Sequence, residues 1–256
     1  MYRHISASEH RAYLKLPDDY KVDGFLIYGT FRTFPYDMLA DALRSLGAPY
    51  QLRRLDQHEF LAPIAEFVVN NRRFWFTTAY GGALLSEYLH LACLFGSKKN
   101  ILVGSCGGLK KGAKSLEIVV PDWSFGEESS AKLYQPDAGH KYEASQPLST
   151  QLAAILSEKY RVHRGPTVTC QAMLGETWDD VIRWAEQGYV AVEMEAATVF
   201  AVSNHFGVDC AAMLRIGDNL IEEETVMDLN YEKSVDLRKQ MSQAIMDRVL
   251  AKLIEE

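Results

Sequence analysis

The chain has 256 residues, of which 48% are hydrophobic and 24% charged, and its formal net charge is −7. This composition is typical of a globular protein with a sizeable core. The acidic balance excludes the basic surface of a nucleic-acid-binding protein, and no apolar run reaches the roughly 18 to 20 residues that cross a bilayer. We therefore expect neither nucleic acid nor a membrane as a partner.

The N-terminal stretch and the cysteines indicate a compartment. Residues 1–19 are too polar for a signal peptide. Cys93, Cys106, Cys170 and Cys210 lack CxxC spacing, and their apolar or Gly-rich surroundings indicate buried free thiols. Free thiols are typical of a reducing compartment, so we expect the protein in the cytoplasm.

Short apolar runs alternate with stretches of helical periodicity along the chain. The first run, GFLIYG, is typical of a buried strand, and apolar residues at helical spacing follow it. Strands are predicted, in chain order, over 24–29, 66–70, 73–80, 100–105, 116–122, 166–170, 189–195 and 209–218. Helices are predicted over 35–47, 83–96, 149–160, 176–188 and 196–207, with a long one from about 232.

This alternation, with several continuously apolar strands, predicts an α/β protein. Its fold class is a three-layer α/β/α sandwich, in which helices cover both faces of a central mixed sheet. The runs on either side of Asn70–Asn71 are expected to form an antiparallel pair. No repeat, low-complexity tract or linker stands out, so we expect a single domain over 1–256.

Several local features are expected between or at the ends of these elements. The Gly-rich run CGGLKKG predicts a turn at 106–112, after the strand at 100–105, and Pro121 is expected to end the strand at 116–122. Aromatic, charged and Gly residues mix over 123–147, which predicts a long functional loop. Thr177 and Gly188 are the expected caps of the helix at 176–188.

Polar residues with possible chemistry fall at strand ends, where ligands of α/β sheets bind. The GSCGG turn can present backbone N–H groups and the Ser105 hydroxyl to an anion, or it is a plain tight turn. Glu195 can accept two hydrogen bonds from a ribose diol, or it caps the helix that follows. Asp218 can hold a proton for general acid catalysis, or it forms an Asx turn. The residues alone leave these alternatives open.

Three motifs together resemble one family. VEMEAA (192–197), GSCGGL (104–109) and GDNL (217–220) form an ordered set that is similar to the nucleoside phosphorylases. That family includes purine nucleoside phosphorylases, uridine phosphorylases and methylthioadenosine nucleosidases. The resemblance covers about residues 23–255. It implies cleavage of the N-glycosidic bond of a nucleoside, and the acid in GDNL favours a purine.

The resemblance implies a role for particular residues, with phosphate as co-substrate and no cofactor or metal. Asp218 would protonate or hydrogen-bond N7 of the purine, and Glu195 would hold the ribose hydroxyls. The other implied contacts are Met194 and Tyr80 to ribose, Gly29, Arg32 and Ser105 to phosphate, and Met173 and Trp178 to the base. His4 would reach the pocket of a neighbouring subunit, which implies a homo-oligomer, either a dimer or a hexamer built of dimers.

One residue departs from the family pattern. Leu102 stands where the family's phosphorylases carry arginine, three residues before Ser105. The loss of one charged hydrogen bond to phosphate, worth about 1.5–3 kcal/mol, predicts a phosphate affinity about 10–100-fold weaker than in a relative that has the arginine. We expect Leu102→Arg to lower the phosphate KM if the guanidinium reaches the pocket.

The same departure leaves the reaction type open. Hydrolytic members of the family use a glutamate to position water, but no acid occurs between Gly24 and Pro35. Phosphorolysis to free base and ribose 1-phosphate is therefore the main hypothesis. The alternatives are a hydrolytic nucleosidase that releases ribose and a catalytically degenerate module that only binds a nucleoside or nucleotide.

Overall fold

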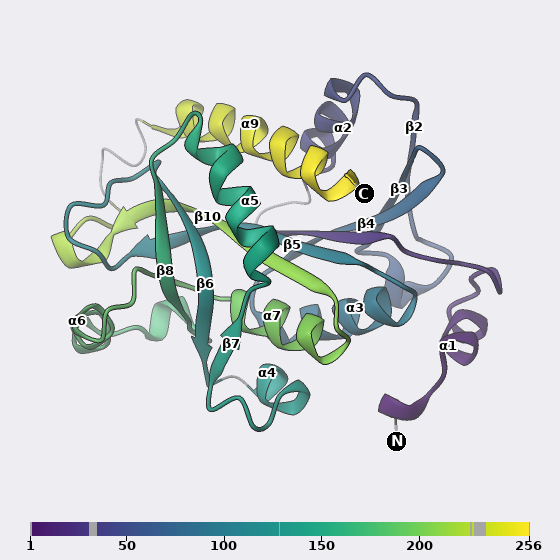
Figure 1. Ribbon diagram of the computed structural model, residues 1–256, viewed down its shortest axis with the longest axis horizontal. Helices are drawn as coiled ribbons and strands as arrows, with labels where there is room; N and C mark the ends of the chain where they lie inside the picture. Colours follow the sequence, from purple (N-terminus) through teal and green to yellow (C-terminus); the bar gives the residue numbers. More distant parts are fainter. Residues whose placement is uncertain (1, 31–34, 128, 226, 228–233, 256) are drawn as a thin grey trace.

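A computed structural model describes residues 2–30, 35–127, 129–225, 227 and 234–255 of the chain. Ten strands of the described part form one mixed sheet, and helices pack on both of its faces (Figure 1). In Figure 1, α2, α5 and α9 lie above the sheet, and α3, α4 and α7 lie below it. The predicted α/β architecture with a central mixed sheet is confirmed.

The described part of the chain contains strands, α-helices and short 3-10 turns. The strands are β1 (Gly24–Gly29), β2 (Tyr50–Arg54), β3 (Ala65–Val69), β4 (Arg72–Ala79), β5 (Lys99–Gly108), β6 (Ile118–Gly126), β7 (Lys141–Glu143), β8 (Val162–Thr169), β9 (Ala191–Glu193) and β10 (Asp209–Asn219). The α-helices are α1 (Ala7–Tyr13), α2 (Tyr36–Ser45), α3 (Gly82–Leu94), α4 (Ser129–Tyr134), α5 (Gln146–Ser157), α6 (Trp178–Glu186), α7 (Ala196–His205) and α9 (Val235–Ile254). Short 3-10 turns are η1 (Tyr2–His4), η2 (Glu59–Leu61), η3 (Met173–Gly175) and η4 (Leu220–Glu222).

The sheet closes on itself over half of its strands. Its order is β10-β6-β8-β9-β5-β1-β4-β3-β2, with β7 on β6, and β10 also pairs with β5. The pairings of β5, β10, β6, β8 and β9 therefore form a ring, from which β1, β4, β3 and β2 extend. Strands β1 and β10 both pair parallel with β5, so the C-terminal ends of the three strands meet at one edge.

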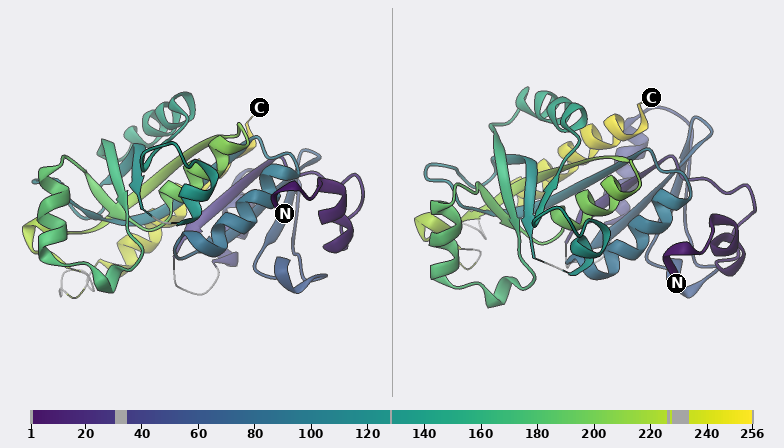
Figure 2. Two further views of the ribbon diagram at one scale, coloured as in Figure 1. Left: turned by 90° about the horizontal axis from the view of Figure 1, so that it is seen from below. Right: turned by 60° about the horizontal axis from the view of Figure 1, so that its bottom comes forward.

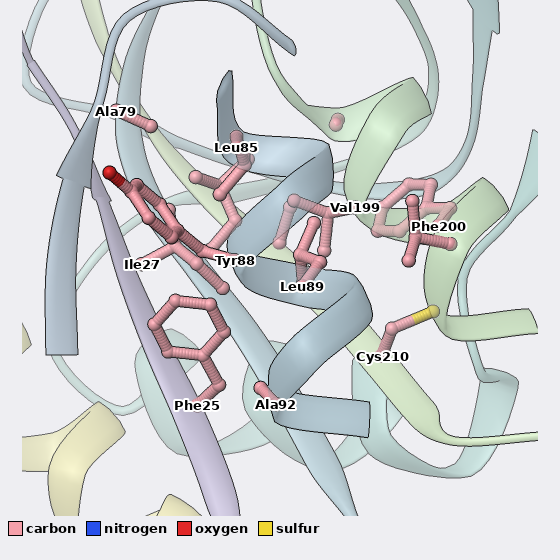
Figure 3. Packing of buried hydrophobic residues seen from close by; sticks show 14 of the residues in the cluster. Phe25, Ile27, Ala79, Leu85, Tyr88, Leu89, Ala92, Val199, Phe200 and Cys210 are labelled. Atoms are coloured by element: carbon pink, nitrogen blue, oxygen red, sulfur yellow. The ribbon is translucent and has the colours of Figure 1, made fainter. Parts of the chain in front are cut away.

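Side-chain alternation along the strands explains the two helical layers. On β1, Phe25 and Ile27 belong to a cluster that contains residues of α3 and α7, and Figure 3 shows them beside Tyr88 and Leu89 of α3. Leu26, between them, belongs to the opposite cluster, which contains residues of α2, α5 and α9. Because β1 is buried on both faces, its side chains are apolar on both, and GFLIYG is therefore a continuous apolar run.

One predicted turn and both predicted caps of α6 are confirmed. Strands β3 and β4 pair antiparallel across Asn70 and Asn71, whose φ angles of 52° and 59° suit a tight hairpin turn. The Thr177 hydroxyl accepts a hydrogen bond from the Asp180 backbone N–H and caps α6. Gly188 follows α6 with a φ of 87°, as a residue that ends a helix does.

Three local predictions are wrong. The predicted turn does not start at Cys106, because β5 continues through Gly108 with β10 paired along it. The turn follows at Lys110–Ala113, where the Ala113 N–H donates to the Lys110 carbonyl oxygen. Pro121 does not end β6: the ladder to β10 covers Ile118 and Val119 and the ladder to β7 starts at Trp123, so the missing N–H falls between them. Residues 123–147 are not one long loop, because they contain the end of β6, α4, β7 and the start of α5.

Strand β2 was not predicted from the sequence. It lies at the edge of the sheet, and most of its side chains are exposed or only half-buried. An edge strand of this kind lacks the apolar run or the alternation that marks a strand in a sequence.

Figure 2 shows the N-terminal segment beside α3, at the end of the molecule remote from α6. The four cysteines are free; Cys93, Cys106 and Cys210 are buried as predicted, whereas Cys170 is half-buried. None of the described helices combines the length and apolarity that a membrane-spanning helix needs.

Candidate functional site

A cleft of about 1190 Å³ opens where the C-terminal ends of β1, β5 and β10 meet the start of α7. The structure brings most of the predicted site residues together along its walls. The residues from that set that line it are Gly29, Tyr80, Ser105, Met173, Trp178, Met194, Glu195 and Asp218. Arg32 lies outside the described residues.

Glu195 lies where three elements converge. Its side chain is 5% exposed, and its Oε1 accepts a hydrogen bond of 2.7 Å from the backbone N–H of Gly81, just before α3. A Cβ on Gly29, at the end of β1, would lie 3.1 Å from Oε2 of Glu195. A side chain at position 29 would therefore press on this carboxylate, which explains glycine there.

The ends of α3 and α7 are packed tightly beside that carboxylate. A Cβ on Gly82 would lie 2.1 Å from Oγ1 of Thr198, a distance that no real side chain tolerates. The Thr198 hydroxyl also shares a hydrogen bond of 3.0 Å with that of Ser130 on α4. This close contact places the Gly81 N–H where Glu195 can accept its hydrogen bond.

The capping alternative applies to Glu193 instead of Glu195. The Glu195 side chain makes no hydrogen bond to the first turn of α7. Oε2 of Glu193 accepts hydrogen bonds from the backbone N–H groups of Glu195 and Ala196, at 2.7 and 2.6 Å. The hydroxyls of Ser124 and Thr169 donate to its other oxygen. Both carboxylate oxygens of Glu193 thus accept hydrogen bonds from protein groups. Glu195 instead lines the cleft, where its carboxylate can accept hydrogen bonds from a ligand.

Burial affects the proton affinity of both acids. Desolvation raises the pKa of Glu195 to about 8, and the neighbouring Glu193 adds to the effect. Burial raises the pKa of Glu193 as well, against its four hydrogen bonds. A ligand that donates hydrogen bonds to Glu195 favours its charged form and lowers this pKa.

Ser105 reaches the cleft from a strand instead of a turn. It is exposed on β5 and lies opposite Arg215 of β10 in parallel register. The backbone of GSCGG pairs with β10 and, at Gly107 and Gly108, with β9, so any backbone N–H group that binds an anion there belongs to a strand and not to a turn. The hydroxyl of Ser105 remains as a donor to a ligand.

Asp218 reaches the cleft because β10 contains a bulge. The register between β10 and β5 shifts between Ile216 and Asp218, so Gly217 is an extra residue. Without it, Asp218 would face away from the side of the sheet that Arg215 faces, since side chains alternate along a strand. Asp218 and Asn219 belong to β10, so the predicted Asx turn is not the local structure.

Asn219 fixes the end of this strand. Its amide nitrogen donates to the carbonyl oxygens of Lys110 and Ala113, at 3.1 and 2.6 Å. These bonds hold the segment after β5 against the end of β10. The hydrogen bonds of the buried Asn219 therefore also help to fix the position of the preceding residue, Asp218.

The base-binding candidates line the cleft from η3 and from the start of α6. Met173 and Trp178 are 40% and 50% exposed, so both present large apolar surface to a ligand. Glu176, between them, also lines the cleft and accepts a hydrogen bond of 2.9 Å from the Cys170 thiol. Burial raises the pKa of Glu176.

Arg215 is a residue of the cleft that no sequence motif predicted. It lines the cleft, and its buried Nη1 has no hydrogen-bond partner within the described ranges. The available signal was one cation inside the otherwise apolar run CAAMLRIG, which matches no motif.

Leu102 does not face the cleft. It is 0% exposed and belongs to the core under α3 and α7. The condition for the predicted effect of Leu102→Arg on phosphate affinity is therefore not met, because a side chain at this position points into the apolar core.

His4 is remote from the cleft of its own chain. It is exposed on η1, and the adjacent Arg3 contacts His205, at the C-terminal end of α7. Glu195 marks the other end of the same helix. A role for His4 in a neighbouring subunit stays a prediction.

The sequence is similar to known phosphorylases. A family model described as the phosphorylase superfamily matches residues 82–251. The chain is 31% identical over 121 residues to a guanosine phosphorylase from Halorubrum lacusprofundi, across 46% of this chain and 49% of that protein. It is 28% identical over 146 residues to a DeoD-type purine nucleoside phosphorylase from Alkaliphilus metalliredigens, across 56% and 63%. The chain thus spans about half to just under two thirds of these relatives.

Solved structures share the fold. An MTAN from Helicobacter pylori superposes with a TM-score of 0.66 at 19% identity, over 91% of this chain and 99% of that one. A futalosine hydrolase mutant from Helicobacter pylori strain 26695 gives a TM-score of 0.65 at 17% identity, over the same shares. At these identities the likeness concerns the fold alone.

Proposed function

The chain belongs to the phosphorylase superfamily, and we propose that it cleaves the N-glycosidic bond of a purine nucleoside by phosphorolysis. One observation carries this proposal. Glu195 and Asp218, from separate elements, line one cleft together with Ser105. A diol-binding acid, a base-protonating acid and an anion-binding hydroxyl are the groups that this reaction needs.

The ribose would lie against Glu195, Met194 and Tyr80. Glu195 has one oxygen bonded to the Gly81 N–H and the other near Gly29, so its carboxylate is held in one orientation. In its ionised form it can accept hydrogen bonds from the 2′ and 3′ hydroxyls. Holding the sugar in this way lowers the entropic part of the barrier.

The purine would lie between Asp218 and the apolar surface of Met173 and Trp178. As the bond between C1′ and N9 breaks, its electron pair moves onto the base, and Asp218 gives a proton to N7. General acid assistance of this kind contributes about 10²–10⁴-fold to the rate.

A phosphate oxygen, held by Ser105 near Gly29, would attack C1′ from the face opposite the base. The new C1′–O bond replaces the C1′–N9 bond, so the products are the free base and ribose 1-phosphate. Phosphate loses one proton as it becomes an ester, and this proton restores Asp218. Arg32, beside this site in the sequence, is proposed as a further phosphate ligand.

A hydrolytic nucleosidase is the second candidate. The sequence keeps it open, because Leu102 replaces the arginine expected in a phosphorylase of this family. Since the Leu102 side chain lies in the core, it does not decide between the two reactions. Water would then attack C1′, and the product would be ribose. A module that only binds nucleosides is less favoured, because binding alone does not require an acid at position 218.

We also propose how the protein works as a whole. It would need phosphate but no cofactor or metal, and would act in the cytoplasm as a homo-oligomer, either a dimer or a hexamer of dimers. His4 would then reach the cleft of a neighbouring subunit. Light scattering that finds a fully active monomer would contradict this arrangement.

The reaction is tested by supplying inosine, guanosine, adenosine and uridine, each with and without phosphate. We expect release of purine bases only with phosphate, together with ribose 1-phosphate. Free ribose as the sole product at saturating phosphate would replace phosphorolysis by hydrolysis. A clear preference for uridine would overturn the assignment of Asp218 to purine N7.

A further inference from the structure

Arg215 and Ser105 face the cleft side by side. They are register partners on the parallel strands β10 and β5, and both line the cleft. Residues in register on neighbouring strands point to the same side of a sheet, and the strands lie about 4.8 Å apart. A single tetrahedral anion can therefore contact both side chains.

Other residues of β10 and β5 show which face of the sheet Arg215 and Ser105 lie on. Met213, two residues before Arg215, belongs to the cluster under α9, and so does Val103, two residues before Ser105. Both also line the cleft. Side chains two residues apart share a face, so Arg215 and Ser105 continue the α9 side of the sheet into the cleft.

One nitrogen of the Arg215 guanidinium lacks a hydrogen-bond partner among the described residues. This nitrogen, Nη1, is buried, and the described part of the chain supplies no hydrogen-bond acceptor to it. A buried charged donor left unsatisfied is costly, and an anion in the cleft would supply the missing acceptor. Arg238 also lines the cleft, but its Nη1 already donates to the Ser234 hydroxyl.

Position 102 is on the wrong side to bind the same anion. Leu102 pairs with Ala212, and both belong to the core under α3 and α7, on the face away from α9. On β10, the register partner of Ser105 is the arginine itself. The cation that is absent at position 102 is thus present on the neighbouring strand, on the side that faces the cleft.

We propose that Arg215, together with Ser105, binds a phosphate group in this cleft. The proposal rests on the proposed function for the source of the phosphate, which is inorganic phosphate if the reaction is phosphorolysis. The same site could hold the 5′-phosphate of a nucleotide. The shared chemistry is a phosphate dianion bound by a guanidinium fork and a hydroxyl.

The test compares wild type with Arg215→Gln and Arg215→Lys, and with Arg248→Gln as a matched control. Arg248 is an α9 arginine that does not line the cleft. In steady-state assays we expect Arg215→Gln to raise the phosphate KM by about 10–100-fold, from the loss of a charged hydrogen bond. The nucleoside KM should change little, and Arg248→Gln should match wild type.

Thermal unfolding gives a readout that does not depend on turnover. Inorganic phosphate at about 100 times its Kd should raise the Tm of wild type and Arg248→Gln by several degrees, but not that of Arg215→Gln. If Arg215→Gln does not fold, Arg215→Lys decides, because it keeps the charge but loses the planar fork. An equal phosphate KM and an equal phosphate-induced Tm shift in wild type and the variants would overturn the proposal.

The outcomes separate this proposal from the proposed function. Stabilisation by a nucleoside 5′-monophosphate but not by inorganic phosphate, lost in Arg215→Gln, would support the anion site and refute phosphorolysis. Release of free ribose with an Arg215-dependent phosphate shift would do the same. If neither phosphate source stabilises wild type, the anion site itself is refuted, whatever the reaction is.

Discussion

The carboxylate of Glu193 accepts a hydrogen bond of 2.7 Å from the backbone N–H of Glu195. One acid of the VEME motif therefore holds the other in place. Glu193 closes the start of α7 and is bonded to protein groups on both oxygens, whereas Glu195 turns its carboxylate to the cleft. The two acids, two residues apart, are expected to respond differently to substitution.

Glu195→Ala should impair ribonucleosides more than 2′-deoxyribonucleosides. The lost carboxylate binds the diol, and a hydrogen bond to a charged group is worth about 1.5–3 kcal/mol. We expect kcat/KM for ribosides to fall by roughly 10–100-fold more than for 2′-deoxyribosides. Steady-state kinetics with inosine and 2′-deoxyinosine measure this difference.

Glu193→Gln is the control for that experiment. It weakens the hydrogen bonds at the start of α7, so it should lower the Tm and reduce activity on both sugars by a similar factor. Equal losses on both sugars for Glu195→Ala would instead mean that Glu195 is structural.

Stability should fall as the pH rises through neutrality. The pKa of Glu195 is about 8 in the folded protein, against an ordinary value of 4.5. The folded state thus holds a proton that the unfolded chain releases, so the contribution is fully present below pH 4.5 and lost as the pH rises towards about 8. Urea unfolding of wild type and Glu195→Gln at pH 5, 6.5 and 8 measures it.

The glutamine variant cannot titrate at position 195, so its stability should decline less steeply over the same range. Glu193 is also buried with a raised pKa, so some slope should remain. Parallel curves for the two proteins would show that Glu195 does not hold the proton.

Asp218→Asn should lower turnover of inosine by about 10²-fold or more, because the amide cannot protonate N7. A substrate that is already methylated at N7, such as 7-methylguanosine, needs no proton from the enzyme. Its turnover should fall much less. Equal losses on both substrates would remove Asp218 from the role of general acid and leave it a positioning residue.

Leu102→Arg should destabilise the protein without improving phosphate binding. The guanidinium would replace a fully buried leucine in the core under α3 and α7. An unpaired buried charge is strongly unfavourable, so we expect a loss of about 3 kcal/mol or more. Urea unfolding measures the loss, and Leu102→Met, which conserves volume, should cost less than about 1.5 kcal/mol. A lower phosphate KM in a folded Leu102→Arg protein would contradict the orientation of this strand.

The sequence by itself determined most of the elements and most of the residues that line the candidate site. Local patterns carry this information, because apolar runs, helical spacing and capping residues act over a few neighbours. The strand at 24–29, the hairpin across Asn70 and Asn71, and the helix that Thr177 caps were predicted in this way. The acids at 195 and 218 were found because they belong to short motifs.

Tertiary structure alone decided how the residues of the candidate site are placed and oriented. The GSCGG segment is a strand because β10 pairs along it, although glycines favour a turn locally. Arg215 faces the cleft because of its register with Ser105, and Asp218 does so because of one extra residue in β10. Register between strands far apart in the chain depends on which faces are buried together, and no window of neighbouring residues encodes it.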